Sequence, residues 1–276
     1  HLMSVGHCCD QIVRLTLREG IPMYEGMIAE TVVIQGNNGD QIDAYFARPT
    51  GSGPHPGVVV IHHMPGWDQD IKEIVRKIAA QGYAAICPNL HHRNGPGTAV
   101  EMSTATREAG GVPDAQFIGD TKGTVQYLLA QPYLNGKVGV IGFCSGGRQV
   151  VIAACNIPEF NAAVDCWGGG VVTAKEDLTE NAPVAPLDMT PNLGCPLLGL
   201  FGNDDARPSP EQVDLHEAEL KKHNKTYEFH RYDGAGHAFF ITSRDNYRVG
   251  AANDGWAKTF DWFEKYLGPI TAQAHP

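Results

Sequence analysis

Short hydrophobic runs alternate with stretches of helical spacing along this chain. Strands are predicted at residues 31–35, 41–47, 57–62, 83–87, 137–142, 162–166, 196–201 and 226–232. Several of these runs are continuous in Val, Ile and Leu, which is typical of strands that helices cover on both faces. The last run alternates between apolar and polar residues, so we expect it nearer to a sheet edge. The first two strands flank Asn37-Asn38-Gly39 and are expected to form an opening pair around this turn.

Helical spacing of apolar residues predicts the remaining elements. Helices are expected at 70–81, 114–130, 209–223 and 246–267, with another that begins near Arg148. The segment 168–195 is rich in Gly, Pro and Asn and is predicted to be a loop that crosses one face of the sheet. This alternation predicts an α/β fold with a mostly parallel central sheet, flanked by helices on both faces.

The length of the chain suits one large α/β domain. We expect this domain to cover residues 10–270, after a disordered or tag-derived N-terminus at residues 1–9. The opening His1-Leu2-Met3 is typical of a cloning remnant and leaves open whether a leader was removed. No apolar run approaches the roughly 20 residues that span a bilayer, and no signal peptide is visible. A cytoplasmic location is therefore predicted.

The net charge of the chain indicates which classes of partner it can bind, and its cysteines indicate the redox compartment. Lys and Arg number 21 against 31 Asp and Glu, which gives a net charge of −10 without any basic run. Such a chain is unsuited to binding nucleic acid or an anionic membrane, so we expect a small-molecule substrate and a monomer or homodimer. The seven cysteines are scattered, which indicates free thiols in a reducing compartment. No cofactor and no metal are predicted.

The sequence GFCSGG at 142–147 joins an expected strand to an expected helix. A nucleophile elbow needs small residues two positions before and two after the nucleophile, because this turn is too tight for a Cβ atom. Gly142 and Gly146 meet that need for Cys144, whereas a Ser145 nucleophile would have phenylalanine at the first flanking position. The helix N-terminus favours a thiolate, and the Ser145 N–H would face an oxyanion. Cys144 is therefore the predicted nucleophile.

The acid and the base of such a hydrolase follow the nucleophile in that order along the chain. His237 comes after the last expected strand, in a loop whose glycines let it fold back toward the elbow, and it is the predicted base. The acid should follow strand 196–201, where Asp204 and Asp205 are both candidates. The acid holds the imidazole tautomer and stabilises the imidazolium. The residues alone do not separate the two candidates.

These motifs resemble the dienelactone hydrolases, also called carboxymethylenebutenolidases, over about residues 30–267. The similar stretches are QPYLNGKVGVIGFCSGG at 131–147, AAQGYAAICPNL at 79–90, the G-x-x-D turn at 202–205 and AGH at 235–237. The G-x-x-D turn favours Asp205 over Asp204 as the acid. The resemblance implies an α/β-hydrolase fold and the opening of a small, dienelactone-like lactone by a Cys144–Asp205–His237 triad.

The resemblance also implies binding residues. The Met64 N–H would be the second oxyanion donor beside Ser145, and Arg93 matches a family arginine that holds the substrate carboxylate. Two positions depart from the family: His63 stands where a glutamate helps to manage the proton of the resting thiol, and Ile241 replaces a second carboxylate-binding arginine. A chain with one anion contact is expected to accept a less charged or bulkier substrate.

Residues that flank the catalytic loops are expected to line the pocket, namely His63, Trp67, Phe239 and Phe240. Three alternatives remain open. The first is a carboxylesterase or thioesterase that acts on less charged esters. The second is a metal-binding protein built on the histidines at positions 62, 63, 91 and 92, although no carboxylate or cysteine stands nearby at ligand spacing. The third is a hydrolase scaffold that serves as a binding module without catalysis.

Overall fold

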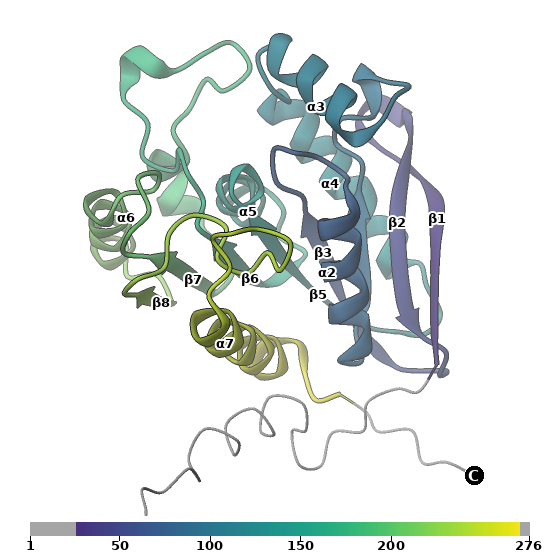
Figure 1. The fold of residues 1–276 in the computed structure, drawn as a ribbon. Coiled ribbons are helices and arrows are strands. Elements are labelled where there is room, and N and C mark those ends of the chain that lie inside the picture. Colours follow the sequence, from purple (N-terminus) through teal and green to yellow (C-terminus); the bar gives the residue numbers. More distant parts are fainter. Residues whose placement is uncertain (1–25, 271–276) are drawn as a thin grey trace, which may run out of the picture.

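The Val- and Ile-rich runs form the centre of an eight-stranded sheet in the computed structural model, which describes residues 26–270 (Figure 1). The strand order is β1-β2-β4-β3-β5-β6-β7-β8. The strands are β1 (Met27–Gln35), β2 (Gln41–Pro49), β3 (His55–Ile61), β4 (Ala84–Pro88), β5 (Leu134–Phe143), β6 (Phe160–Cys166), β7 (Leu197–Gly202) and β8 (Tyr227–Tyr232). All eight predicted strands are therefore confirmed. The expected N-terminus at residues 1–9, and residues 10–25 of the expected domain, lie outside the described residues.

The sheet is parallel from β4 through β8, and only β2 runs against its neighbours β1 and β4. β1 and β2 form the predicted opening pair. Their connection places Asn38 at φ 57° and Gly39 at φ 81°, a conformation that these two residue types tolerate well. β8 lies at the other edge of the sheet, as its alternating pattern indicates.

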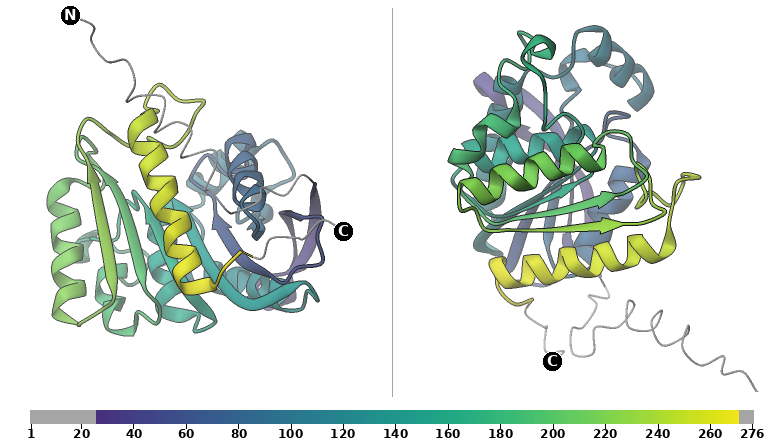
Figure 2. Two further views of the ribbon diagram at one scale, coloured as in Figure 1. Left: turned by 90° about the horizontal axis from the view of Figure 1, so that it is seen from below. Right: turned by 90° about the vertical axis from the view of Figure 1, so that its left-hand side faces the viewer.

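Helices cover both faces of the sheet. They are α2 (Gln69–Ala80), α3 (Ala99–Glu108), α4 (Asp114–Leu129), α5 (Ser145–Asn156), α6 (Pro210–Lys222) and α7 (Val249–Leu267). Apolar residues of α2 and α7 pack on one face, and those of α4, α5 and α6 pack on the other. Figure 2 shows α7 and α6 on opposite sides of the sheet. The predicted flanking of the sheet on both faces is confirmed.

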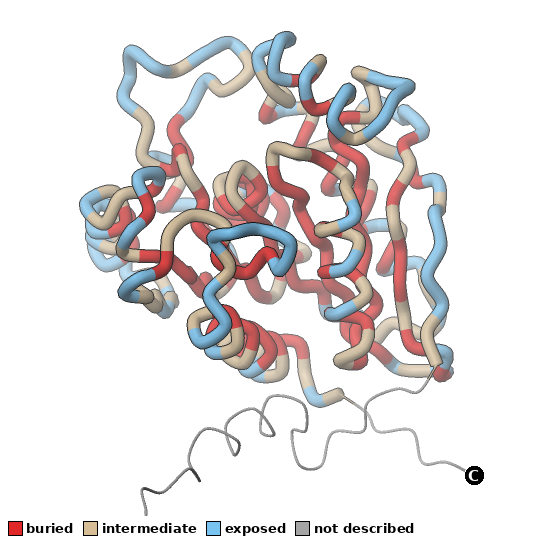
Figure 3. Tube along the Cα trace, viewed as in Figure 1, coloured by how far each residue is buried: buried red, intermediate tan, exposed pale blue. Residues whose placement is uncertain are grey.

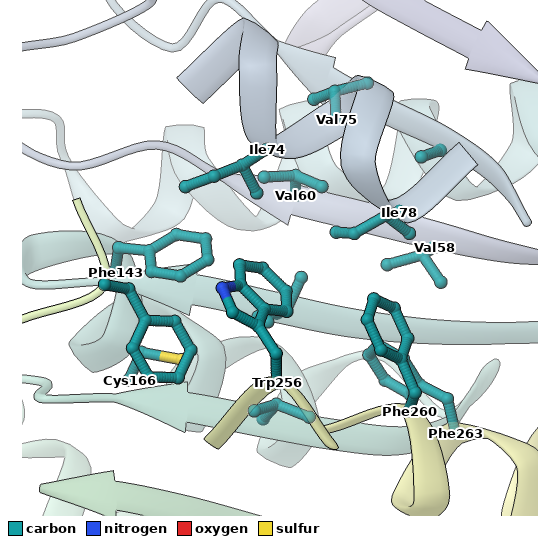
Figure 4. Close-up of a cluster of buried hydrophobic side chains, with 14 of the residues drawn as sticks. Val58, Val60, Ile74, Val75, Ile78, Phe143, Cys166, Trp256, Phe260 and Phe263 are labelled. Atoms are coloured by element: carbon teal, nitrogen blue, oxygen red, sulfur yellow. The ribbon is translucent and has the colours of Figure 1, made fainter. Parts of the chain in front are cut away.

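The core lies between these layers, and the buried segments run through the central strands (Figure 3). In the cluster of Figure 4, Ile74 and Ile78 of α2 belong to the same group of buried side chains as Phe260 and Phe263 of α7. Val58 is among the fully buried residues beneath them. Such a packed core holds the ends of the central strands in fixed positions, which the loops at those ends require.

Two segments differ from the sequence prediction. Helix α3 was not predicted, because the residues that it buries are Ser103 and Thr106 and no apolar stripe marks it. Its one signal is the capping box formed by Thr98 and Glu101. The segment 168–195 contains two short 3₁₀ helices, η3 (Lys175–Asp177) and η4 (Pro186–Asn192), where a loop was expected, and η4 packs on α5 and α6.

Candidate active site

Cys144 occupies the corner between β5 and α5. Its backbone has φ 58° and ψ −117°, a combination that a residue with a side chain adopts only when its surroundings impose it. The Cys144 N–H donates to the Cys166 carbonyl at 3.1 Å, and its own carbonyl accepts from the Gly147 N–H at 2.9 Å. A Cβ at Gly146 would collide with the carbonyl oxygens of Ile61 and His62. The glycine that flanks the corner is therefore required by close packing against the end of β3.

The amides of Met64 and Ser145 follow two neighbouring strands. β3 and β5 are parallel partners, with Ile61 opposite Gly142 at their carboxyl ends. No acceptor for either amide is seen within residues 26–270. The His63 carbonyl accepts from the Gly66 N–H at 2.9 Å, and this bond fixes the His63–Met64 peptide and hence the direction of the Met64 N–H. Free N–H groups with fixed directions are what an oxyanion hole needs.

His237 and Asp205 are hydrogen-bonded to each other. The distance from His237 Nδ1 to Asp205 Oδ2 is 2.8 Å, and the other carboxylate oxygen accepts from the Arg207 N–H at 2.8 Å. Asp205 is 6% exposed, whereas the neighbouring Asp204 carboxylate is exposed and has no hydrogen-bond partner within residues 26–270. The geometry therefore pairs Asp205, and not Asp204, with the imidazole.

The surroundings of His237 favour its protonated form. Burial lowers the pKa of His237, but the hydrogen bond to Asp205 and the adjacent Cys144 side chain raise it more strongly, to about 10. The ring is consequently an imidazolium at neutral pH. An imidazolium beside a cysteine stabilises the thiolate, so this pair can supply a nucleophile without a further base.

Cys144 and His237 open into one pocket of about 350 Å³. Its other lining residues are His63, Pro65, Trp167, Ala238, Ile241, Arg244, Asp245 and Asn246. Of the residues predicted to line it, only His63 does so. Arg244 and its two successors were not predicted, because exposed polar residues in a loop carry no periodic signal.

The other predicted lining residues lie elsewhere. Phe239 is fully buried and packs on Trp167, with 4.9 Å between the ring centroids, and Phe240 is also in the core. Trp67 lines a separate, larger pocket of about 780 Å³ in which Cys144 has no part. Its Nε1 donates to the Cys87 carbonyl at 3.1 Å. Sequence position beside a catalytic loop did not reveal the direction of these side chains.

Arg93 does not line the pocket of Cys144. Its Nη1 and Nη2 bind the two carboxylate oxygens of Asp120 at 2.8 and 3.0 Å, and its Nε binds Asp40 at 2.7 Å. Asp120 is fully buried, so the guanidinium neutralises a charge that has no access to water. The expected substrate contact is thus a structural ion pair in this chain.

The four neighbouring histidines do not form a metal site. Both ring nitrogens of His62 are engaged, Nδ1 with the His63 carbonyl at 2.9 Å and Nε2 with the Leu90 N–H at 3.2 Å. His63 binds Asp68, with 2.7 Å between Nε2 and Oδ2. Across residues 26–270, no group of three or more His, Cys, Asp or Glu side chains is arranged to hold a metal ion.

The comparison with known proteins decides the family. Residues 42–267 match the model of the family described as "Dienelactone hydrolase family". The chain belongs to the dienelactone hydrolase family. A "Putative carboxymethylenebutenolidase" of Salmonella typhimurium is 33% identical over 247 residues, which cover 88% of this chain and 90% of that protein. A "Probable 2-oxo-3-(5-oxofuran-2-ylidene)propanoate lactonase" of a Bradyrhizobium species is 29% identical over 249 residues, which cover 87% of this chain and 98% of that protein.

Solved structures agree with this assignment. The crystal structure of a "Putative Dienelactone Hydrolase" from Klebsiella pneumoniae is similar with a TM-score of 0.81 and 32% identity, covering 88% of this chain and 100% of that one. The dienelactone hydrolase family member described here therefore has the α/β-hydrolase fold and is a hydrolase of esters or lactones, with a small-molecule substrate. Within the part of the chain that the structure describes, no helix has the length and apolarity to cross a membrane.

Proposed function

We propose that this dienelactone hydrolase family member opens a small lactone by acyl transfer to Cys144, with His237 as the acid–base residue and Asp205 as its orienter. The observation that carries the proposal is the juxtaposition of two features in one pocket. One is a cysteine held at φ 58° on a strand-to-helix corner, and the other is an imidazole that is hydrogen-bonded to a buried carboxylate.

The first half of the reaction forms a thioester. The Cys144 thiolate attacks the lactone carbonyl, and the resulting oxyanion accepts hydrogen bonds from the N–H groups of Met64 and Ser145. Collapse of this intermediate breaks the ring C–O bond, and His237 gives its proton to the leaving oxygen and then regains one from solvent. Removal of one oxyanion donor in such a site typically costs about 10²–10³ in rate.

The second half returns the enzyme to its starting state. A water molecule loses a proton to a base and attacks the thioester carbonyl, and the C–S bond then breaks. The acid product leaves, and Cys144 departs as a thiolate that the His237 imidazolium stabilises. This division of one hydrolysis into two easier steps is the advantage of a covalent nucleophile.

A lactone is the favoured substrate because relatives that span nearly the whole chain are named carboxymethylenebutenolidase and lactonase. A pocket of about 350 Å³ suits a small ring. Simple esters are the second candidate, since Arg93 is engaged by two aspartates and Ile241 lines the pocket at the position of the second family arginine. Both observations favour a substrate with less negative charge.

Arg244 is the cation that could still meet a substrate carboxylate. It lines the pocket of Cys144, and its Nε is 3.7 Å from Asp70, which is too long for a strong ion pair. We expect Arg244→Ala to lower kcat/KM selectively for lactones that carry a carboxylate, and Arg93→Ala to show no such selectivity. Equal losses on charged and neutral substrates would remove Arg244 from the binding site.

The test of the proposal itself is a panel of dienelactone, neutral lactones and p-nitrophenyl acetate, applied to the wild type and to Cys144→Ala. Turnover of every substrate should disappear in the variant. Cys155→Ala is the matched control, because burial raises the pKa of that helical thiol to about 12 and it lies outside the pocket. Retention of wild-type turnover by Cys144→Ala would refute the proposal.

A further inference from the structure

A second aspartate–histidine pair, whose histidine lines the same pocket as the thiol, is built in the same way as the first. In the Asp205–His237 pair, one carboxylate oxygen accepts a backbone N–H at 2.8 Å and the other binds the imidazole at 2.8 Å. In the Asp68–His63 pair, Oδ1 accepts the Ile71 N–H at the start of α2 at 3.0 Å, and Oδ2 binds the imidazole at 2.7 Å. Each aspartate is thus fixed by the main chain and fixes a histidine in turn.

The two histidines follow strands that lie on opposite sides of β5. His63 follows β3, which lies on one side of β5, whereas His237 follows β8, beyond β6 and β7 on the other side. Both histidines line the pocket that contains the thiol. An acyl group on Cys144 would therefore share its pocket with two imidazoles, each supported by an aspartate.

One ring nitrogen of His63 is free to act in this pocket. Nε2 is bound to Asp68, and Nδ1 has no hydrogen-bond partner within residues 26–270, although it is not a fully buried atom. Burial raises the pKa of Asp68, but the hydrogen bond and the charge of His63 lower it below its ordinary value. Asp68 is consequently ionised at neutral pH and can stabilise a proton that His63 takes up.

We propose that His63 is the general base of deacylation and takes the proton from the water that hydrolyses the Cys144 thioester, with Asp68 as its positioning residue. The inference rests on the proposed function, since it requires an acyl-enzyme on Cys144. It divides the two half-reactions between the two pairs, His237 serving the formation of the thioester and His63 its hydrolysis.

The water oxygen bonds to the thioester carbonyl carbon while one water proton passes to His63 Nδ1. The tetrahedral intermediate then collapses, the C–S bond breaks, and the electron pair of that bond leaves with the Cys144 sulfur. The carboxylic acid product ionises to solvent, as does the proton on His63, so the resting enzyme is recovered.

A second base is useful because His237, which is hydrogen-bonded to Asp205, is protonated again from solvent after it has served the leaving oxygen. The hydrogen bond to Asp205 persists in the acyl-enzyme and continues to favour the imidazolium. A protonated His237 cannot take a proton from water, but it is suited to help the departing thiolate. With p-nitrophenyl acetate the leaving phenolate needs no proton, so His237 remains protonated throughout acylation.

The test separates the two half-reactions of p-nitrophenyl acetate hydrolysis in His63→Asn. Because kcat/KM reports the steps up to thioester formation, it should stay unchanged together with the rate of the first p-nitrophenolate release. Loss of a general base typically costs about 10²–10⁴-fold, so kcat should fall by about 10²-fold or more and KM should fall with it. Hydroxylamine attacks thioesters without a base and should restore the turnover of the variant.

Two further variants keep the test decisive. Asp68→Asn retains a side chain that caps α2 but removes its charge, so it should lower kcat by a smaller factor and leave kcat/KM unchanged. His223→Asn breaks a surface His–carboxylate pair of 2.9 Å on α6 and should change neither constant. Thermal melting of each variant checks that its fold is intact.

The outcomes are distinct. An unchanged kcat in both His63→Asn and Asp68→Asn, or a parallel loss of kcat and kcat/KM that hydroxylamine does not rescue, would overturn the role of His63. Failure of the proposed function looks different: the wild type would then form no acetyl adduct on Cys144. Accumulation of that adduct in His63→Asn, detected by peptide mass spectrometry, is the result that we expect.

Discussion

Asp205→Asn changes one charge in the site and leaves the shape of the side chain almost intact. The amide oxygen of the new residue still accepts the Arg207 N–H, so its NH₂ group has to face His237 Nδ1. The imidazole then carries its proton on Nε2 and donates to Cys144 while it is neutral. The charged hydrogen bond that favours the imidazolium is lost, and such bonds contribute about 1.5–3 kcal/mol.

That loss of free energy corresponds to a reduction of kcat/KM by about 10–100-fold. The wrong tautomer can increase the reduction to about 10⁴-fold, as in the serine protease triad. The pH profile gives a second readout. Since Asp205 raises the pKa of His237, its removal lowers that pKa, and the alkaline limb of kcat/KM should move from near pH 10 to lower pH. Initial rates of dienelactone opening across pH measure both effects, because the leaving oxygen of the lactone takes its proton from His237.

Asp204→Asn is the matched control, because it removes an equal charge one residue away from an exposed carboxylate. We expect its kcat/KM to remain within about twofold of the wild type, as is usual for surface substitutions. A loss in Asp204→Asn as large as that in Asp205→Asn would refute the reasoning. So would an unshifted alkaline limb in Asp205→Asn.

Three further substitutions have expected outcomes. Arg93→Ala leaves the buried Asp120 carboxylate unpaired and should lower the free energy of unfolding by about 3–5 kcal/mol in urea titrations, without selectivity among substrates. Gly146→Ala places a Cβ against the Ile61 carbonyl, so it should abolish thiol reactivity at Cys144 while much of the circular dichroism signal remains. Burial raises the pKa of Asp165 to about 7, so this carboxyl binds its proton more tightly in the folded state and stability falls as pH rises from about 4 to 7. Asp165→Asn should flatten that dependence and raise the melting temperature at pH 8.

The sheet was predictable because its strands are buried on both faces. Runs rich in Val and Ile, such as 57–62 and 137–142, are typical of strands that helices cover on both faces. Helix α3 was not predictable in this way, since it buries Ser103 and Thr106 instead of an apolar stripe. Its capping box at Thr98 and Glu101 was the only local signal.

The same distinction between local and distant signals decides which residues of the site could be predicted from the sequence. The corner at Cys144 could be recognised because a tight turn requires glycine at fixed positions, and that requirement is local. The ion-pair partners of Arg93 could not be predicted from the sequence. Asp40 and Asp120 come from distant segments, and no local pattern indicates that they contact Arg93. His63 and Asp68 of the second pair are only five positions apart, but the significance of this pair depends on a pocket that the fold creates.

The most direct test of the account is to follow inactivation by iodoacetamide at neutral pH together with the site of labelling. We expect loss of esterase activity to coincide with modification of Cys144, located by peptide mass spectrometry. The half-buried thiol of Cys155 and the buried thiol of Cys195, whose pKa values burial raises to about 12, should remain unlabelled. An enzyme that keeps its full activity after complete modification of Cys144 would contradict the central claim.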